Sequence, residues 1–282
     1  MQFGDYRVEI VPDTEFRLDG GAMFGVVPRT LWSRVCPPDE QNRIRMNMNC
    51  VFIDTGGERI LIETGIGEKW PAKHTEMYGI TRERPLAQSI RSVAGVEPDS
   101  ITIVVNTHLH FDHAGGNTVL NAAGHAIPAF PNARYFVSKD EHEHAEAPSE
   151  RDRASYLPDN WRPLAVSGQL ELKEANYEVV PGLRLETYPG HNRSMQCWRL
   201  DSKGQTLFGF ADLVPMRAHV PLAWIMGYDL FPTETLEMKK KLLPQAAREG
   251  WSCLFYHDPD QPLCTLVETD GKLAAVPVEQ VN

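Results

Sequence analysis

The chain has 282 residues, 42% of them hydrophobic, and a formal net charge of −10 at pH 7 with histidine counted as neutral. This length provides a large core and fits one α/β or sandwich domain. The negative charge argues against nonspecific binding to nucleic acid or to an anionic membrane. We therefore expect a small-molecule substrate, no nucleic-acid partner and no membrane partner, with homodimer formation left open.

The N-terminus and the cysteines indicate a cytoplasmic protein. The first ten residues carry charges and lack the apolar segment of a signal peptide. No run of eighteen apolar residues occurs that would predict a membrane span. The five cysteines are scattered and form no CxxC motif, which is typical of reduced thiols.

Strand and helix patterns alternate along the chain without a long linker. Runs of β-branched and aromatic residues predict strands at Tyr6–Val11, Cys50–Asp54, Arg59–Glu63, Ile101–Val105, Arg134–Val137, Leu183–Thr187, Cys197–Leu200, Thr206–Phe210 and Ser252–Tyr256. Apolar residues at helical spacing predict helices at Leu86–Val93, Lys139–Glu146 and Thr233–Glu249. We expect a single domain, residues 1–282, in which the stretch 147–168, with its three prolines, is an insertion that can form a lid.

An internal repeat relates two segments that lie 147 residues apart. The segment MNCVFIDTGGERIL from Met48 resembles MQCWRLDSKGQTLF from Met195, and each reads as a β-hairpin with a glycine in its turn. At the same offset a proline opens a predicted helix, and a histidine then ends a strand, His110 in one copy and His257 in the other. Two hairpins can look alike by chance, but the shared order predicts two similar halves that deliver ligands from strand ends.

Four potential metal ligands follow one apolar strand, in the sequence ITIVVNTHLHFDHAGGN. His108 and His110 are two residues apart at the strand end, where both imidazoles can face one side. Asp112 and His113 come next, and the glycines after them allow a tight turn. The spacing predicts a loop that holds one metal ion or shares two.

Three polar residues that directly follow other apolar runs are candidates to complete the set. They are His191 in TYPGHNRS, Asp212 in LFGFAD and His257 in CLFYHDPD. Catalytic zinc sites use histidine nitrogen and carboxylate oxygen and keep a coordination position for water. A pair of ions would need about six or seven protein ligands, which the two sets together supply.

Each of these residues also has a structural interpretation. Asp112 can be a helix N-cap, His191 can be a turn residue after Pro-Gly, and His257 can be a histidine whose polar atoms are satisfied in the core or at the surface. The whole ordered set is harder to explain structurally than any single member.

The pattern H-x-H-x-D-H, Gly-His, a strand-end Asp and a late His resembles that of the metallo-β-lactamase-fold hydrolase superfamily, over about Cys50 to His257. The resemblance implies an α/β fold, an αββα sandwich of two similar halves. It also implies two divalent metal ions, zinc first, with manganese, iron or cobalt as alternatives. By the family pattern His108, His110 and His191 hold the first ion, Asp112, His113 and His257 hold the second, and Asp212 bridges both. Glu63 stands where the family has an Asp that supports the metal histidines.

The departures from the family pattern favour its lactonase branch, which includes the quorum-quenching acyl-homoserine lactone hydrolases. Asp212 occupies the position of a Cys in common zinc β-lactamases, no flavodoxin-like domain follows His257, and no tRNA-binding arm is evident. Some lactonases place a Tyr three residues after the bridging Asp, where this chain has Pro215, and Tyr228 is our candidate for that role.

The resemblance implies a metal-dependent hydrolase in which a metal-bridging hydroxide attacks a lactone or ester carbonyl. Asp112 is the expected catalytic residue, because it can accept the hydroxide proton and return it to the leaving group. Phe24, Trp32 and Tyr228 lie in apolar stretches that form either ordinary core or a substrate wall. The alternatives are a phosphoester or phosphotriester hydrolase, a glyoxalase II-like thioesterase or its sulfur-oxidising relative, and a non-catalytic binding module.

Overall fold

The computed structural model describes residues 1–278, and within them the chain forms two units. Unit 1 comprises Met1–Glu15 and Met48–Tyr177, and unit 2 comprises Phe16–Asn47 and the chain from Glu178 onward. Each unit contains β-strands and helices of its own, as expected for two similar halves.

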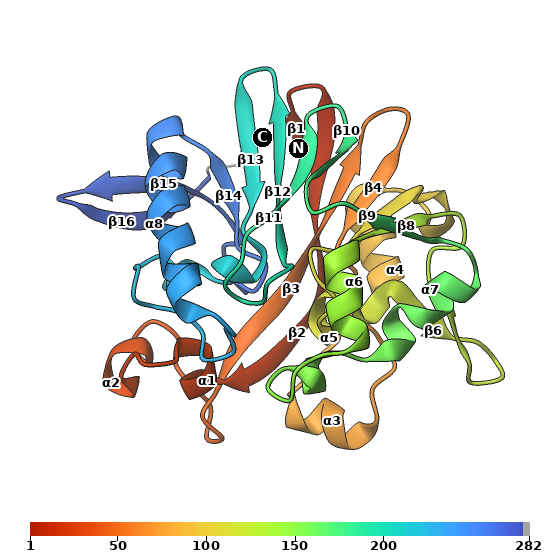
Figure 1. Cartoon of the computed structure of the whole chain (residues 1–282), viewed down its shortest axis with the longest axis horizontal. Coiled ribbons are helices and arrows are strands. Elements are labelled where there is room, and N and C mark those ends of the chain that lie inside the picture. The colour runs from red at the N-terminus through yellow and green to blue at the C-terminus, as the bar shows by residue number, and fades with distance from the viewer. Residues whose placement is uncertain (279–282) are drawn as a thin grey trace. The chain divides into compact units, whose positions relative to one another are not determined.

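The first seven-stranded sheet has the order β1-β2-β3-β4-β5-β8-β9 (Figure 1) and belongs to unit 1, except that residues 16–19 of β2 and 43–47 of β3 are part of unit 2. Its strands are β1 (Gln2–Phe3), β2 (Tyr6–Asp19), β3 (Arg43–Asp54), β4 (Arg59–Ile62), β5 (Ile103–Val105), β8 (Arg134–Ser138) and β9 (Leu170–Lys173), and a separate pair is formed by β6 (Thr118–Leu120) and β7 (Ala126–Pro128). From β4 to β9 the neighbours are parallel. Side chains following parallel strands therefore emerge at one edge of this sheet.

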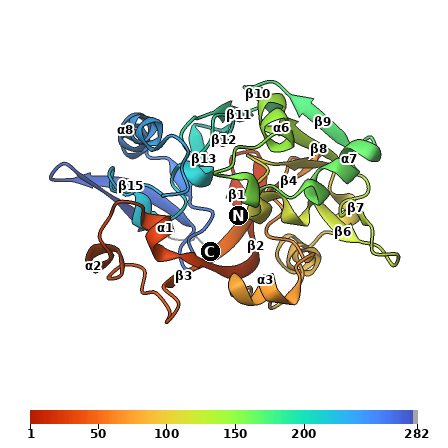
Figure 2. The same cartoon turned by 60° about the horizontal axis from the view of Figure 1, so that its bottom comes forward.

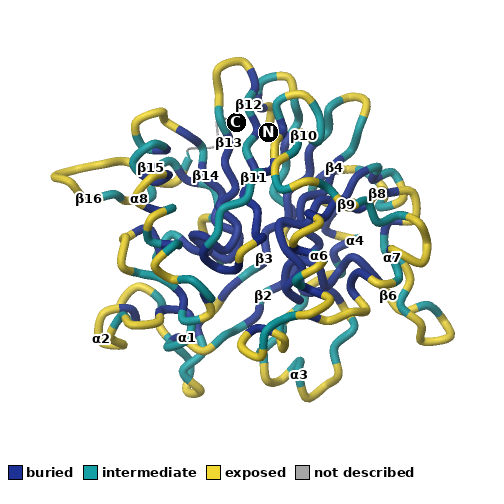
Figure 3. Tube along the Cα trace, in the orientation of Figure 1, coloured by how far each residue is buried: buried dark blue, intermediate teal, exposed yellow. Residues whose placement is uncertain are grey.

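The helices of unit 1 are α3 (Ala72–Met77), α4 (Leu86–Ser89), α5 (Phe111–Ala114), α6 (Lys139–Glu146) and α7 (Arg162–Val166). α6 begins at an N-cap in which Ser138 accepts a hydrogen bond from the Glu141 backbone N–H. α6 packs against β8 and β9. The central strands β4 and β5 are buried almost throughout, as expected for a parallel sheet. Figure 3 shows buried residues in dark blue, many of them along strands, and exposed residues in yellow, mainly in loops.

Unit 2 contains a second seven-stranded sheet with the order β10-β11-β12-β13-β14-β15-β16. Its strands are β10 (Tyr177–Val180), β11 (Leu183–Thr187), β12 (Gln196–Ser202), β13 (Gln205–Gly209), β14 (Ser252–Leu254), β15 (Leu263–Thr269) and β16 (Lys272–Pro277), and its helices are α1 (Gly20–Phe24), α2 (Arg29–Trp32) and α8 (Pro232–Glu249). α8 packs against β15 (Figure 2). β13 and β14 are parallel, and both lead into candidate ligands.

The two copies of the repeat form hairpins with the same register. Val51 of β3 pairs with Ile62 of β4, and Trp198 of β12 pairs with Gly209 of β13. Both members of the second pair lie 147 residues after those of the first. The predicted repeat of two hairpins is therefore confirmed.

The histidine correspondence predicted from the repeat is wrong. Ile62 pairs with Val105 of β5, whereas Gly209 pairs with Leu254 of β14, so the strands after the hairpins are offset by 149 residues. His108 and His257 each stand third after their strand, which makes His108 the counterpart of His257. The connection between hairpin and strand is two residues longer in the second copy, and a fixed sequence offset hides this.

The five cysteines are free thiols. Four of them are buried, and burial raises the thiol pKa of Cys50 and Cys197 well above its usual value. Such thiols are poor nucleophiles. None of the helices in the described part of the chain combines the length and the apolar character that a bilayer crossing needs.

Lys239 connects α8 to the segment that follows Asp212. Its side chain is fully buried, and Nζ donates hydrogen bonds to the carbonyl oxygens of His219 at 2.7 Å, Pro221 at 2.9 Å and Trp224 at 2.8 Å. Three acceptors match the three donors of an ammonium group. This contact fixes the course of residues 219–224 in unit 2.

Replacing this lysine should destabilise the protein. Lys239→Met keeps the aliphatic stem but leaves three buried carbonyls without their donor, and should lower the free energy of unfolding by about 3 kcal/mol. Lys240→Met is the matched control, because Lys240 is exposed and forms a surface pair with Glu237, and it should change stability by less than about 0.5 kcal/mol. Urea unfolding of both variants measures the difference, and equal stability would show that the buried ammonium contributes nothing.

Candidate metal centre

The loop after β5 places three imidazoles of unit 1 close together. The ring centroids of His108 and His110 are 4.6 Å apart, and those of His108 and His113 are 4.0 Å apart. His108 and His110 each offer a ligand atom within 4.8 Å of the other, as do Asp112 and His113. All four side chains are buried.

Asp112 is not the N-cap of the short helix that contains it. His110 takes the N-cap position of α5, and Asp112 lies within the first turn. The capping alternative for Asp112 is therefore excluded, and its carboxylate remains a candidate ligand. The tight turn after it depends on a close backbone contact, because a Cβ atom on Gly116 would lie 2.1 Å from the carbonyl oxygen of Thr64.

Glu63 stabilises this loop through hydrogen bonds, as its position in the sequence predicts. It is fully buried at the end of β4, and its Oε1 accepts hydrogen bonds from the backbone N–H of Thr107, at 3.0 Å, and from the Thr107 hydroxyl. Nδ1 of His113 lies 3.4 Å from the same oxygen. Thr107 Oγ1 in turn lies 3.1 Å from Nδ1 of His108. Glu63 has a φ of +64°, an uncommon backbone conformation for a residue with a side chain.

In unit 2, the candidates His191 and His257 both lie close to the carboxylate of the third candidate, Asp212. Nε2 of His257 lies 3.0 Å from Oδ1 of Asp212, and Nε2 of His191 lies 3.3 Å from Oδ2 of the same residue. The three side chains are buried. His191 follows β11, Asp212 follows β13 and His257 follows β14, which is the strand-end placement predicted from the sequence. The turn and core interpretations of the two histidines do not account for this convergence on Asp212.

Asp229 is a functional candidate that the sequence did not reveal. Its buried carboxylate lies 3.0 Å from Nδ1 of His191 and accepts a hydrogen bond from the Thr235 hydroxyl at 2.6 Å. A carboxylate on Nδ1 keeps that nitrogen protonated, which leaves the Nε2 lone pair for a metal ion. Ligand histidines generally require such a partner, so a carboxylate could be expected for His191. No spacing rule in the sequence identifies it as Asp229.

Backbone contacts and an ion pair fix the segment around His257. Its Nδ1 lies 3.1 Å from the carbonyl oxygen of Asn47, and its backbone N–H donates to the carbonyl oxygen of Pro215 at 2.9 Å. Next to it, Asp258 accepts hydrogen bonds from the backbone and from Nε of Arg217, the latter at 2.9 Å. Pro215, at the position of the expected Tyr, thus contributes through its backbone.

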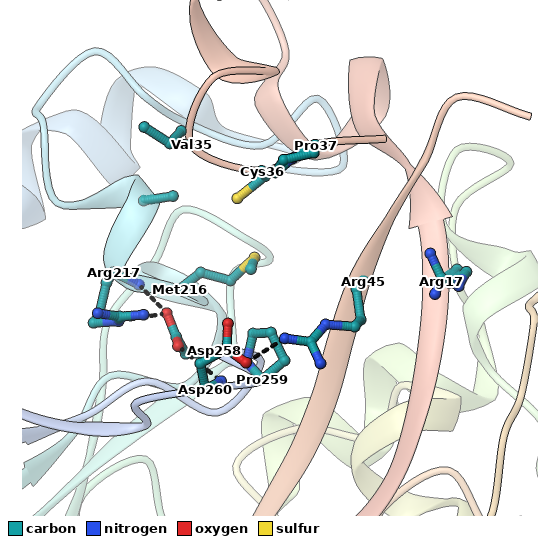
Figure 4. Close-up of a pocket in the computed structure, with 11 residues that line it drawn as sticks. Arg17, Val35, Cys36, Pro37, Arg45, Met216, Arg217, Asp258, Pro259 and Asp260 are labelled. Atoms are coloured by element: carbon teal, nitrogen blue, oxygen red, sulfur yellow. Dashed lines mark hydrogen bonds and ion pairs between the residues drawn. The ribbon is translucent and has the colours of Figure 1, made fainter. Parts of the chain in front are cut away.

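A cavity of about 580 Å³ in unit 2 lies beside this segment (Figure 4). The Arg217–Asp258 pair forms one wall, and Arg45 on β3 reaches Asp260 across the opening. Arg17 on the neighbouring strand also lines it. The cavity therefore combines charged side chains with apolar ones such as Val35 and Met216, so it is not a uniformly apolar wall of the kind expected for an acyl chain.

The residues predicted to contact substrate have different environments. Phe24 and Trp32 are buried and stack with ring centroids 5.4 Å apart. Phe24 also stacks on His219 at 4.7 Å; burial lowers the pKa of His219 to about 3, so this ring is neutral, and its Nε2–H donates to the carbonyl oxygen of Met23 at 2.8 Å. Tyr228 is 39% exposed, so it is the most accessible of the three predicted substrate contacts.

An aromatic group beside Asp112 was missed in the sequence. The Phe111 ring lies 5.2 Å from that of Trp70 and 5.1 Å from that of Tyr78, centroid to centroid. Trp70 and Tyr78 are only partly buried. Burial, with a smaller contribution from the Asp112 carboxylate, raises the pKa of the Tyr78 hydroxyl. Trp70 and Tyr78 flank α3, a helix that was not predicted, so only the structure brings them to Phe111.

The donor atoms in both units fit divalent metal ions. Each unit presents buried imidazole nitrogens together with a carboxylate, the donor set of zinc, manganese, iron and cobalt sites. A buried Asp212 carboxylate between two imidazoles needs positive charge nearby. Partners on Nδ1 of His108, His191 and His257 are the supporting interactions that ligand histidines require.

Comparisons with known proteins agree with this geometry. The family model described as "Metallo-beta-lactamase superfamily" matches residues 44–250. An N-acyl homoserine lactonase of Bacillus thuringiensis is 28% identical over 234 residues, which cover 75% of this chain and 81% of the relative. A probable metal-dependent hydrolase from Staphylococcus aureus superposes with a TM-score of 0.89 at 30% identity, covering 100% of both chains. AidC, described as a dizinc quorum-quenching lactonase, superposes with a TM-score of 0.80 at 20% identity, covering 100% of this chain and 97% of AidC.

Proposed function

Because the chain belongs to the metallo-β-lactamase superfamily and is a metal-dependent hydrolase, we propose that it opens the ring of acyl-homoserine lactones with the aid of two divalent metal ions. Two observations support the proposal. Each unit contains a set of buried potential ligands, and sequence relatives of the chain are lactonases. The observation that carries the proposal is the convergence of His191 and His257 on Asp212.

The proposed ligands follow the family pattern. The first ion is assigned to His108, His110 and His191, the second to Asp112, His113 and His257, and Asp212 is shared. We propose zinc as the metal, since histidine and carboxylate donors suit it; manganese, iron and cobalt accept the same donors. When bound, such a pair of ions supplies Lewis-acid polarisation of the carbonyl and a nucleophilic water at neutral pH.

The remaining steps belong to the chain's own side chains. The Asp112 carboxylate takes the proton of the attacking water and returns it to the leaving oxygen as the ring opens. Glu63 keeps the Thr107 backbone, and with it His108, in place. Asp229 keeps Nδ1 of His191 protonated. These contacts maintain the ligand geometry before substrate arrives, which lowers the cost of reorganisation during the reaction.

The acyl group is proposed to pack on aromatic side chains. Trp70, Tyr78 and Phe111 form a partly buried group next to Asp112 in unit 1. A surface of this kind accepts an alkyl chain without desolvating polar groups. Phe24, Trp32 and Tyr228 remain predicted contacts, and among them Tyr228 is the most accessible to a substrate.

Lactone ring opening, followed with a pH indicator, tests the proposal. Zinc-loaded protein should hydrolyse acyl-homoserine lactones, and Trp70→Ala should raise KM for a decanoyl chain about tenfold while changing KM for a butanoyl chain little, because only the long chain buries area on the ring. Leu31→Ala, at a side chain that is 46% exposed, is the control. Faster turnover of a phosphotriester or a glutathione thioester than of every lactone would replace the proposal with that activity.

A further inference from the structure

Glu141 is a buried carboxylate that contacts the ligand loop. It lies on α6 with 0% of its surface exposed. Its Oε1 accepts a hydrogen bond from the backbone N–H of Leu109 at 2.8 Å and another from the hydroxyl of Tyr156 at 3.0 Å. A buried polar group is costly unless hydrogen bonds offset its desolvation, and these two bonds provide that compensation for Glu141.

The first of these bonds acts on the backbone between two candidate ligands. Leu109 stands between His108 and His110, and it is itself fully buried. A hydrogen bond to its N–H fixes the peptide on which the direction of both imidazoles depends. Glu141 therefore acts on His108 and His110 through the backbone of Leu109, which lies between them.

The second bond brings the stretch 147–168 to the same loop. Tyr156 forms an isolated β-bridge with His110, and its ring centroid lies 4.7 Å from that of His110 in an edge-to-face arrangement. Tyr156 is 4% exposed. The His110 side chain thus packs against a residue of the stretch that the sequence predicts as a lid.

This stretch is attached to α6 at two further points. Asp152 lies 2.7 Å from Nε2 of His144, and the indole N–H of Trp161 donates to Glu146 at 2.6 Å. Tyr156 and Trp161 also join a buried cluster with Leu109, Ala114, Val137 and Ala145. A segment that opens and closes would have few buried contacts, and this segment has many.

We propose that Glu141 is a positioning residue, and that residues 152–161 are a fixed support for the metal-ligand loop instead of a mobile lid. The inference rests on the proposed metal ligands, although the geometry lies entirely within unit 1. The carboxylate joins α6, the Leu109 backbone and Tyr156, so that His108 and His110 are oriented before a metal ion binds.

Three variants and one control test this role in the full-length protein. Glu141→Leu removes the oxygen that accepts both bonds, Glu141→Gln keeps an acceptor oxygen at that position, and Tyr156→Phe removes one donor. Glu143→Leu is the matched control on the same helix, since Glu143 is exposed and pairs with the surface residue Lys139. Zinc affinity is measured by competition with a chromophoric chelator, and protection of the Leu109 amide by hydrogen exchange of the metal-free protein.

We expect Glu141→Leu to weaken zinc binding about 10- to 100-fold, the range found when a residue supporting a metal ligand is removed. The Leu109 amide should also exchange faster, and kcat for lactone should fall with little change in KM. Glu141→Gln should restore affinity to within about threefold, and Tyr156→Phe, which keeps the fold even if Glu141→Leu does not, should weaken it about two- to tenfold.

Unchanged zinc affinity and unchanged Leu109 exchange in Glu141→Leu and Tyr156→Phe would overturn the inference while leaving the proposed function intact. Loss of affinity in Glu143→Leu to the same extent would also overturn it, because the effect would then belong to α6 in general. If the wild type bound zinc but hydrolysed no ester, the proposed function would fail, and the exchange and affinity measurements would still decide the role of Glu141.

Discussion

Asp212→Ala should reduce kcat/KM for an acyl-homoserine lactone by about a thousandfold or more and should lower the number of zinc ions bound per chain. The Asp212 carboxylate lies within 3.3 Å of both His191 and His257, and in the proposed site it is shared by both ions. Its loss removes negative charge where two cations must be held close together, so the second ion should be lost first. Steady-state kinetics and metal analysis after dialysis measure the two effects.

The control for this variant is Asp99→Ala. Asp99 is exposed, and its removal should change neither activity nor metal content. If Asp212→Ala retained two ions and at least a tenth of the wild-type activity, Asp212 would not be a shared ligand, and the assignment of ions to residues would have to be revised.

Asp229→Ala should weaken zinc binding about 10- to 100-fold, because ligand histidines depend to this extent on the residues that orient them. Without the carboxylate, His191 can take the other tautomer, in which Nε2 carries the proton and cannot bind a metal ion. The buried Thr235 hydroxyl also loses its acceptor. kcat/KM should fall together with affinity when zinc is limiting and should recover in part when zinc is added in excess.

Thr235→Val separates orientation from simple stability. This change removes the 2.6 Å bond to Asp229 but leaves the contact between Asp229 and His191, so its effect on zinc affinity should be smaller, about two- to tenfold. Zinc titration of both variants at constant pH makes the comparison. Equal affinities of Asp229→Ala and the wild type would show that the carboxylate does not set the His191 tautomer.

The parts of the account that could be predicted from the sequence depend on short-range patterns. The αββα class, confirmed by the family match, was implied by the family resemblance of the motif around His108 and agreed with the repeat. The helix Lys139–Glu146 has the predicted bounds, since its capping serine and helix-forming residues are adjacent in the chain. The strand predicted at Tyr6–Val11 continues to Asp19, because pairing with neighbours extends a strand beyond its apolar run.

The parts that could not be predicted depend on contacts between distant residues. β9 and β10 were missed because residues 170–173 and 177–180 are largely half-exposed and lack a strong apolar signal. β15 and β16 were missed for the same reason near their exposed ends. Asp229, 38 residues from His191, and Glu141, 32 residues from Leu109, have no local pattern that separates them from surface acids.

The repeat also shows the limit of reasoning from a fixed offset. The hairpins keep the register of 147 residues, while the following strands differ by two, so the equivalence runs from His108 to His257. A sheet constrains which residues pair, whereas connections between strands tolerate changes in length. The equivalent strands β5 and β14 therefore lead to the equivalent ligands His108 and His257, whereas His191 and Asp212 follow other strands of unit 2.

Zinc stoichiometry is the measurement that tests the central claim most directly. Metal-free protein should be equilibrated with a small excess of zinc, dialysed, and analysed for metal and for protein by independent methods. The account predicts two ions per chain in the wild type, with the content reduced by His108→Ala and by His257→Ala, one variant from each unit. One ion or none in the wild type, or full occupancy in both variants, would contradict a dinuclear centre formed by these residues.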